Sequence, residues 1–193
     1  MPCVYDLAMP TSITAADSHA PIDAASPWVL RFADHVVPGG KVLDVACGGG
    51  RHARFFADRG HHVDAVDRDI DQLSALLRAQ PADITPLQAD IEAGPWPFSG
   101  VRYAAVIVTN YLHRPLFPAL LAAVEPGGLL IYETFALGNG QYGRPSRAEF
   151  LLQPGELLDA VRADFEVLAY ENGYVATPKA AVVQRVAARR AVA

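Results

Sequence analysis

Short apolar runs alternate with amphipathic segments through the first two thirds of the chain. A continuous apolar run is typical of a strand covered on both faces. Apolar residues at intervals of three and four positions indicate a helix with one buried face. The apolar runs predict strands over residues 41–45, 62–66, 84–88, 103–109 and 129–134. The amphipathic segments predict helices over residues 27–37, 51–59, 70–78 and 116–124.

Residues at the ends of these segments support the boundaries. Ser26 and Pro27 are residue types preferred at the N-cap and first position of a helix, and residues 38–40 end that helix. Gly60 is suited to close the second helix, because glycine adopts the left-handed conformation that often follows a helix. Residues 126–128 predict a turn before the fifth strand.

The pattern changes after the fifth strand. Residues 135–150 are rich in Gly, Asn, Arg and Pro and predict a loop, and residues 154–161 predict a helix. The last strands are predicted over 165–170 and 180–186, with Asn172-Gly173 as the turn signal between them. Too few residues separate these strands for a crossover helix, so we expect an antiparallel hairpin at one edge of the sheet.

Strands that alternate with helices predict a parallel sheet with helices on both faces. The expected fold class is therefore α/β: a Rossmann-like, doubly wound, mostly parallel seven-stranded sheet with a C-terminal antiparallel hairpin. Residues 1–25 have no clear period and are expected to form a flexible arm or lid, with one domain over residues 26–193.

The composition fits a folded domain and narrows the class of partner. Of the 193 residues, 51% are hydrophobic and 19% are charged, which is typical of a globular chain. The net charge of −5 weighs against a nucleic-acid partner, because such proteins usually present a basic face. No apolar run reaches membrane-spanning length, and the two cysteines do not indicate a disulfide framework. We expect a cytoplasmic protein, either a monomer or a homodimer.

A glycine-rich loop follows the first strand and precedes the second helix, where open α/β sheets bind their ligands. It occupies residues 46–50, and Asp44 stands just before it. Glycines let a ligand approach the backbone closely. A loop that binds the pyrophosphate of a dinucleotide usually follows its strand directly with glycine. An acidic residue at that point suits a ligand that carries an ammonium group.

Two more acidic residues follow the next strands. Asp67 ends the second strand, where a carboxylate can accept both ribose hydroxyls of an adenosine. Asp90 follows the third strand and could accept from an adenine amino group, with the Ile91 amide beside the ring. The alternatives are that Asp44 and Asp67 cap helices or turns, and that Asp90 merely ends a strand.

These motifs resemble those of the class I S-adenosylmethionine (SAM)-dependent methyltransferases. Residues 44–50 resemble the first motif of that family, residues 63–67 the second, residues 89–91 the third, and residues 126–131 the turn and strand that follow the fourth. The resemblance implies SAM as cofactor and S-adenosylhomocysteine as product. The cofactor-binding residues that it implies are Asp44, Ala46, Cys47, Gly48, Gly50, Asp67, Arg68, Asp90, Ile91 and Asn110.

Ala46 departs from the family, which usually has glycine at this position. Its methyl group is tolerable if φ stays negative, and it narrows the space beside the methionine moiety. Cys47 is expected to be a small buried residue and not a nucleophile.

More narrowly, the chain resembles the small tellurite-resistance and thiopurine-type methyltransferases. The cues are the compact length, residues 49–52 after the first motif, and residues 154–157 before the final hairpin. This resemblance implies a small-molecule acceptor, because no inserted domain is present to hold a macromolecule.

Residues 110–114 follow the fourth strand, whose end faces the transferable methyl group in this family. His113 is a candidate general base, because the free pKa of histidine, about 6.5, suits proton removal at neutral pH. The alternative is that His113 caps or packs at the start of the next helix. Tyr111 is the second candidate catalytic residue and could wall the cofactor or the acceptor. The amino-group methyltransferase motif of Asn or Asp, two prolines and an aromatic is absent.

The acceptor site is expected to draw on this segment, the end of the fifth strand and the loop that follows. Its candidate residues are Tyr111, His113, Arg114, Glu133, Tyr142 and Arg144. Arg144 could anchor an anionic acceptor, because guanidinium groups bind carboxylates well. Arg147 in the same loop is expected to be solvated. No cluster of cysteine, histidine and carboxylate has metal-site spacing, so no metal is expected.

Three other functions compete with catalysis by a small-molecule methyltransferase. An NAD-dependent oxidoreductase would need the spacing G-x-G-x-x-G, which residues 46–51 fit poorly. A non-catalytic SAM-binding regulator would share the whole cofactor site. An RNA methyltransferase is disfavoured by the acidic composition and by the lack of an added binding domain.

Overall fold

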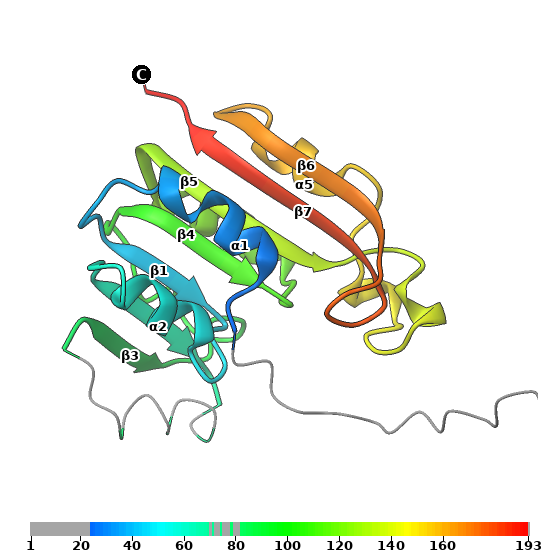
Figure 1. Ribbon diagram of the computed structural model, residues 1–193, viewed down its shortest axis with the longest axis horizontal. Coiled ribbons are helices and arrows are strands. Elements are labelled where there is room, and N and C mark those ends of the chain that lie inside the picture. Colours follow the sequence, from blue (N-terminus) through cyan, green and yellow to red (C-terminus); the bar gives the residue numbers. More distant parts are fainter. Residues whose placement is uncertain (1–23, 70, 72–73, 75–77, 79–81, 193) are drawn as a thin grey trace, which may run out of the picture.

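The computed structural model describes residues 24–69, 71, 74, 78 and 82–192 (Figure 1). The predicted arm lies outside the described residues except at its end, and so does most of the predicted helix over residues 70–78. None of the helices in the described part of the chain is long and apolar enough to cross a membrane.

The described strands form one seven-stranded sheet with the order β3-β2-β1-β4-β5-β7-β6. Their bounds are β1 Val42–Val45, β2 Val63–Asp67, β3 Ile84–Gln88, β4 Tyr103–Thr109, β5 Val124–Phe135, β6 Phe165–Val175 and β7 Ala181–Arg190. The first five strands pair in parallel, whereas β7 pairs antiparallel with both β5 and β6. The predicted fold class is confirmed.

The parallel register brings the carboxyl ends of the strands to one edge. Val45 of β1 pairs with Val66 of β2 and with Val108 of β4, and Val108 pairs with Tyr132 of β5. The residues that follow these strands therefore meet at the same edge, where open α/β sheets hold their ligands.

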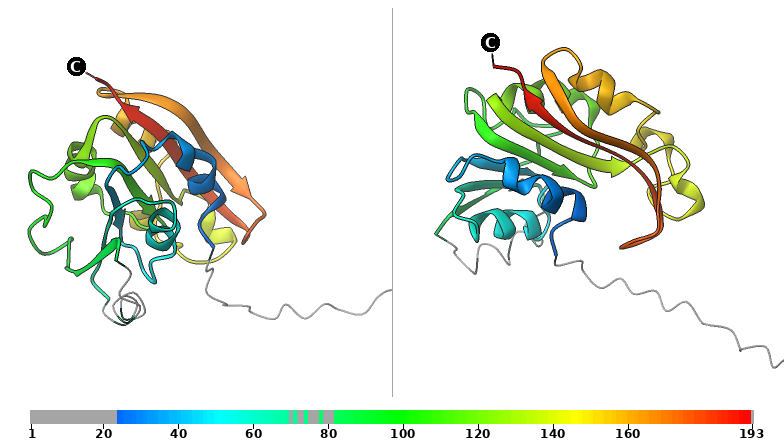
Figure 2. Two further views of the ribbon diagram at one scale, coloured as in Figure 1. Left: turned by 60° about the vertical axis from the view of Figure 1, so that its left-hand side comes forward. Right: turned by 45° about the horizontal axis from the view of Figure 1, so that its top comes forward.

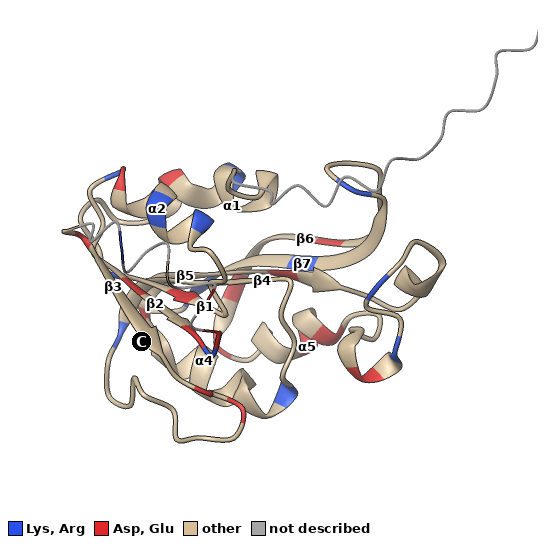
Figure 3. Ribbon diagram, turned by 90° about the horizontal axis from the view of Figure 1, so that it is seen from below, with Lys and Arg blue, Asp and Glu red and all other residues tan. Residues whose placement is uncertain are grey.

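Helices cover both faces of the sheet (Figure 3). Helices α1 (Pro27–Phe32) and α2 (Arg51–Ala57) lie on one face, and α4 (Phe117–Ala123) and α5 (Glu156–Val161) lie on the other. The Ser26 side chain caps α1 as predicted, accepting a hydrogen bond from the Trp28 amide at 3.1 Å. Each face buries its own apolar cluster, and the central strands supply apolar side chains to both.

Short 3-10 turns extend or connect these elements. One, η1 (Ala33–His35), continues α1 toward the predicted helix end, and η2 (Arg114–Leu116) leads into α4. Two others, η3 (Asn139–Gln141) and η4 (Ala148–Phe150), lie in the loop predicted after β5.

The hairpin turn predicted at Asn172-Gly173 is wrong. These residues lie inside β6, where they pair with Gln184 and Val183 of β7. The turn falls on residues 176–180, which include Pro178. The longer pairing satisfies more backbone groups, and proline cannot donate to a strand ladder. Both views in Figure 2 show the end of this hairpin beside the loop over residues 136–150.

The turn predicted over residues 126–128 lies within the bounds of β5, which begins at Val124. The register with β4 shifts at this point, and Gly127 has φ +80°. The predicted turn is therefore an irregularity inside a longer strand.

Candidate active site

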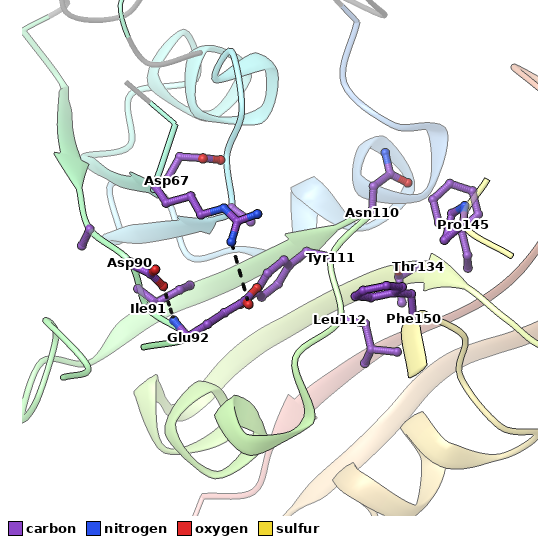
Figure 4. Close-up of a pocket in the computed structure, with 14 residues that line it drawn as sticks. Asp67, Asp90, Ile91, Glu92, Asn110, Tyr111, Leu112, Thr134, Pro145 and Phe150 are labelled. Atoms are coloured by element: carbon purple, nitrogen blue, oxygen red, sulfur yellow. Dashed lines mark hydrogen bonds and ion pairs between the residues drawn. The ribbon is translucent and has the colours of Figure 1, made fainter. Parts of the chain in front are cut away.

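A pocket of about 390 Å³ opens at the carboxyl edge of the parallel strands (Figure 4). Seven residues predicted from the sequence line it: Ala46, Asp67, Arg68, Asp90, Ile91, Asn110 and Tyr111. Seven further residues line it that were not named individually as site residues: Ala89, Glu92, Leu112, Thr134, Phe135, Pro145 and Phe150. The ends of β1 to β5 all contribute, as the parallel register requires.

The glycine loop turns sharply enough to expose its backbone at the pocket. Gly48 and Gly50 have φ values of +54° and +74°. Ala46, which lines the pocket, has φ +52°, so the condition of a negative φ, under which its methyl group would be tolerable, is not met. The left-handed conformation is sterically unfavourable for a residue with a Cβ atom, and such strain is concentrated at functional sites.

Asp67 joins the second strand to the glycine loop. Its Oδ2 accepts a hydrogen bond from the Gly48 amide at 2.8 Å, and its Oδ1 accepts one from the Asp69 amide at 2.9 Å. An ionised carboxylate has about four lone-pair directions, so the same oxygens can still accept bonds from a ligand. The structure thus brings Asp67 and the loop into one crevice.

Asp44 lies beneath the loop and does not line the pocket. Its Oδ2 accepts a hydrogen bond from the Ala53 amide in α2 at 3.0 Å, and only 1% of the residue is exposed. Burial raises the pKa of Asp44 to about 7. The side chain therefore links β1 to the first turn of α2. Burial also raises the pKa of the Cys47 thiol, which opposes formation of a thiolate.

Asp90 shapes the turn after β3 from an exposed position on the pocket wall. Its Oδ1 accepts hydrogen bonds from the amides of Glu92 at 3.0 Å and Ala93 at 3.1 Å. These two bonds lower the pKa of Asp90. Ile91 beside it is buried and adds an apolar surface. The predicted contact of Asp90 with an adenine amino group stays a prediction.

Glu92 is a charged lining residue that the sequence reasoning missed. Its carboxylate lies 4.0 Å from Nη1 of Arg68 and 4.0 Å from Nδ1 of His113. In Figure 4 Glu92 lies beside the Tyr111 ring. Glu92 stands two residues after Asp90 in the loop that follows β3, and this position was the signal for it in the sequence.

The Tyr111 hydroxyl is a buried polar group at the pocket. No group in the described part of the chain meets hydrogen-bonding geometry with it. Burial, and then the negative charge of Glu92, raises the pKa of Tyr111. A buried hydroxyl without a partner is costly, and a ligand in the pocket could supply one.

Most of the predicted acceptor residues do not line the pocket. The Arg114 guanidinium donates to both carboxylate oxygens of Glu156, at 2.6 and 2.9 Å, and to the carbonyls of Glu149 and Leu151. Arg114 therefore fastens the loop before α5. His113 is partly exposed and contacts the pocket through Glu92.

The other predicted acceptor residues point elsewhere. Glu133 pairs with Arg185 at 3.6 Å, and its neighbour Thr134 faces the pocket, as alternation along a strand requires. Tyr142 packs against Tyr174 at 5.0 Å between ring centroids. Arg144 is exposed, and only the adjacent Pro145 lines the pocket.

A buried histidine connects elements whose ends lie near the pocket. His52 of α2 accepts a hydrogen bond at Nε2 from the Ser26 amide at 3.2 Å, and its Nδ1 lies 3.5 Å from Oγ1 of Thr109. Burial, and then the charge of Arg51, lowers the pKa of His52 to about 3. His52 thus joins the start of α1, the start of α2 and the end of β4, one residue before Asn110.

Comparison with known proteins agrees with this arrangement. Residues 42–128, which include β1 to β4 and the glycine loop, match the model of a family described as methyltransferase domain. The predicted resemblance to class I SAM-dependent methyltransferases is thereby confirmed.

Among curated relatives, the chain is 32% identical over 107 residues to malonyl-[acyl-carrier protein] O-methyltransferase from Serratia marcescens. That match covers 54% of this chain and 42% of the relative. The chain spans between about two fifths and one half of the curated relatives that it matches.

Two solved structures show the same fold. TehB from Haemophilus influenzae superposes with a TM-score of 0.69 and 20% identity, covering 84% of this chain and 61% of that chain. The 1,6-didemethyltoxoflavin-N1-methyltransferase from Burkholderia thailandensis, solved with bound 1,6-didemethyltoxoflavin and S-adenosylhomocysteine, superposes with a TM-score of 0.62 and 19% identity. That superposition covers 86% of this chain and 77% of the other.

The groups around the pocket are of the kinds that an aminoacyl-adenosine ligand needs. Asp67 retains acceptor capacity at the end of β2, and Ile91 offers an apolar surface at the end of β3. The Tyr111 hydroxyl is buried at the same pocket, beside the Glu92 carboxylate. These groups lie around one crevice and match the mixed polar and apolar character of adenosine.

Proposed function

We propose that this protein is a SAM-dependent methyltransferase that acts on a small-molecule acceptor. The observation that carries the proposal is the bond between Asp67 and the Gly48 amide, which sets a carboxylate and a glycine loop in one crevice. The same crevice is lined by Asp90, Ile91 and Asn110 at the neighbouring strand ends. The relative named demethylmenaquinone methyltransferase, 33% identical over 116 residues, supports a small acceptor.

In this proposal Asp67 accepts the ribose hydroxyls, while Asp90 and Ile91 hold the adenine ring. Ala46 and the loop glycines allow close approach of the methionine moiety. SAM, when bound, supplies an electrophilic methyl group on a sulfonium centre.

The protein contributes mainly by holding the reacting centres in line and excluding water. Tyr111 and Asn110 stand between the end that binds adenosine and the apolar end of the pocket (Figure 4). His113, whose Nδ1 lies 4.0 Å from the Glu92 carboxylate, accepts a proton where the acceptor must lose one. An acceptor that is already nucleophilic needs no such base.

Calorimetry with SAM and S-adenosylhomocysteine tests the proposal. The native protein should bind both ligands, and Asp67→Ala should weaken binding by about 100-fold, since hydrogen bonds to a charged group contribute most. The matched control is Asp58→Ala, an exposed position at the end of α2. Absence of binding to the native protein would remove the proposal.

Two further assays separate the competing functions. Titration with NADH should give no fluorescence change if the site holds SAM in place of a dinucleotide. Transfer of a labelled methyl group to a panel of thiols and hydroxyl compounds separates an enzyme from a non-catalytic SAM-binding regulator. A cytoplasmic location and a monomeric or homodimeric state remain predictions.

A further inference from the structure

Charge is distributed unevenly around the pocket. Its charged lining residues, Asp67, Arg68, Asp90 and Glu92, all come from the ends of β2 and β3. We call the lining from β4, β5 and the loop after β5 the uncharged half. It includes Asn110, Leu112, Thr134, Phe135, Pro145 and Phe150. Figure 4 shows this separation, with Asp67 and Asp90 at one end and Leu112, Pro145 and Phe150 at the other.

Three arginines near the uncharged half are paired with carboxylates, whereas Arg144, next to Pro145, is exposed. The pairs are Arg114 with Glu156, Arg147 with Glu149, and Arg185 with Glu133. Arg147 also lies over the Phe150 ring, 5.7 Å from its centroid. A guanidinium that is already paired with a carboxylate offers little net positive charge to an incoming anion.

The uncharged half has an apolar surface that the described residues leave partly exposed. Phe150 lines the pocket although 45% of it is exposed. Leu112, Phe135 and Pro145 are only partly buried around the same space. Exposed apolar surface of this kind is covered favourably by an apolar ligand.

We infer that the acceptor is an uncharged molecule with an apolar body, an inference that rests on the methyltransferase function proposed above. The apolar body lies against Leu112, Phe135 and Phe150. The reacting polar group lies beside Asn110 and Thr134, which can hydrogen-bond to it without adding charge. The nearest charges of the pocket are mainly acidic and repel an anion.

This inference differs from the sequence expectation that Arg144 anchors an anionic acceptor. The two models predict opposite preferences for a matched pair of probes, 2-naphthol and 6-hydroxy-2-naphthoate, which differ by one carboxylate. Fluorescence titration of the full chain, with and without S-adenosylhomocysteine, measures both affinities. We expect 2-naphthol to bind at least about tenfold more tightly, because an unpaired carboxylate is costly to bury.

Three variants locate the preference. Phe150→Ala should weaken 2-naphthol binding several-fold. Phe150→Arg should reverse the preference toward the carboxylate probe, and the exposure of this residue allows the change without disrupting the core. Arg144→Ala should leave the ratio of the two affinities unchanged.

Tighter binding of 6-hydroxy-2-naphthoate by the native protein, lost in Arg144→Ala, would overturn the inference. Equal affinities that no Phe150 variant changes would overturn it as well. Failure of the proposed function is a distinct result, because the protein would then bind no S-adenosylhomocysteine while the titrations without it still rank the two probes.

Discussion

Ala46 and Asn110 share the same left-handed backbone conformation at the ends of two directly paired strands. Their φ values are +52° and +55°, and β1 and β4 pair through Val45 and Val108. Both residues line the pocket, so the chain turns away on either side of one crevice. The strained backbone therefore lies where the ligand is expected, and strained residues are often found at functional sites.

The two residues differ in how well they tolerate this conformation. Ala46→Gly should raise the free energy of unfolding by about 0.5–1 kcal/mol. Glycine avoids the steric strain of alanine in the left-handed conformation, but it loses more backbone entropy on folding, which offsets part of the gain. Asn110→Gly should change it by less than about 0.5 kcal/mol, because asparagine enters this region at lower cost. Urea denaturation at one pH measures both. A loss of stability in Ala46→Gly would contradict this account of the loop.

The strand ends were predictable because their signals are local. The bounds of β3 and β4 agree with the sequence prediction, since each is an apolar or alternating run flanked by polar residues. The parallel register then forces Asp67, Asp90 and Asn110 to the same edge. This reasoning needs only the order of strands and helices along the chain.

The acceptor end depends on contacts that no local pattern encodes. The path of the loop after β5 is fixed by a bridge between Ala136 and Leu152, and by Arg114, which binds Glu156 from 42 residues away. Phe150 enters the pocket from a segment that reads as a polar loop. The turn signal at Asn172-Gly173 was overridden by the longer pairing of β6 with β7.

Asp44 should make stability fall as the pH rises. Its pKa in the folded protein is about 7, against 3.8 for the unfolded reference, so the folded state binds the proton more tightly. The contribution of Asp44 is complete below pH 3.8 and is lost as the pH rises through 7. Asp44→Asn cannot ionise and can still accept from the Ala53 amide. The free energy of unfolding of Asp44→Asn, measured relative to that of the native protein, should be about 2 kcal/mol higher at pH 8 than at pH 5.

Urea denaturation at pH 5 and pH 8 measures this difference, with the exposed Asp58→Asn as control. The control should show no comparable change between the two pH values. An Asp44→Asn variant that is less stable than the native protein by the same amount at both pH values would show that the carboxylate is stabilising in its charged form.

His52 should act in the opposite direction. Its pKa is about 3 in the folded protein and 6.5 in the reference state, so the unfolded chain binds the proton more tightly. The contribution of His52 is present above pH 6.5 and is lost as the pH falls toward 3. The loss in free energy of unfolding from pH 7 to pH 5 should be about 2 kcal/mol smaller in His52→Gln than in the native protein.

Asp44 and His52 change the pH dependence of stability in opposite directions over the same pH range. Each variant therefore leaves the effect of the other residue visible. Asp44→Asn should leave a protein that loses stability on acidification, and His52→Gln one that gains it. Thermal or urea unfolding of the two variants gives the signs directly. His62→Gln, whose side chain is 71% exposed, is the matched control and should follow the native curve. Slopes of the same sign in both variants would contradict the assigned shifts.

Arg114 distinguishes a structural tie from an acceptor anchor. Its guanidinium makes two bonds to Glu156 and two to backbone carbonyls, so Arg114→Met leaves that carboxylate and both carbonyls without this partner. We expect a loss of about 2 kcal/mol in the free energy of unfolding, since hydrogen bonds to charged groups are the stronger ones. The exposed Arg144→Met should change stability by less than about 0.5 kcal/mol.

A double-mutant cycle completes this test. Arg114→Met and Glu156→Gln should couple by about 1 kcal/mol, because the two side chains share a bidentate contact. The ratio of 2-naphthol to 6-hydroxy-2-naphthoate affinity should stay at its native value in Arg114→Met. A variant that keeps its stability but changes that ratio would instead place Arg114 in contact with the acceptor, and the loop before α5 would then be held by other bonds.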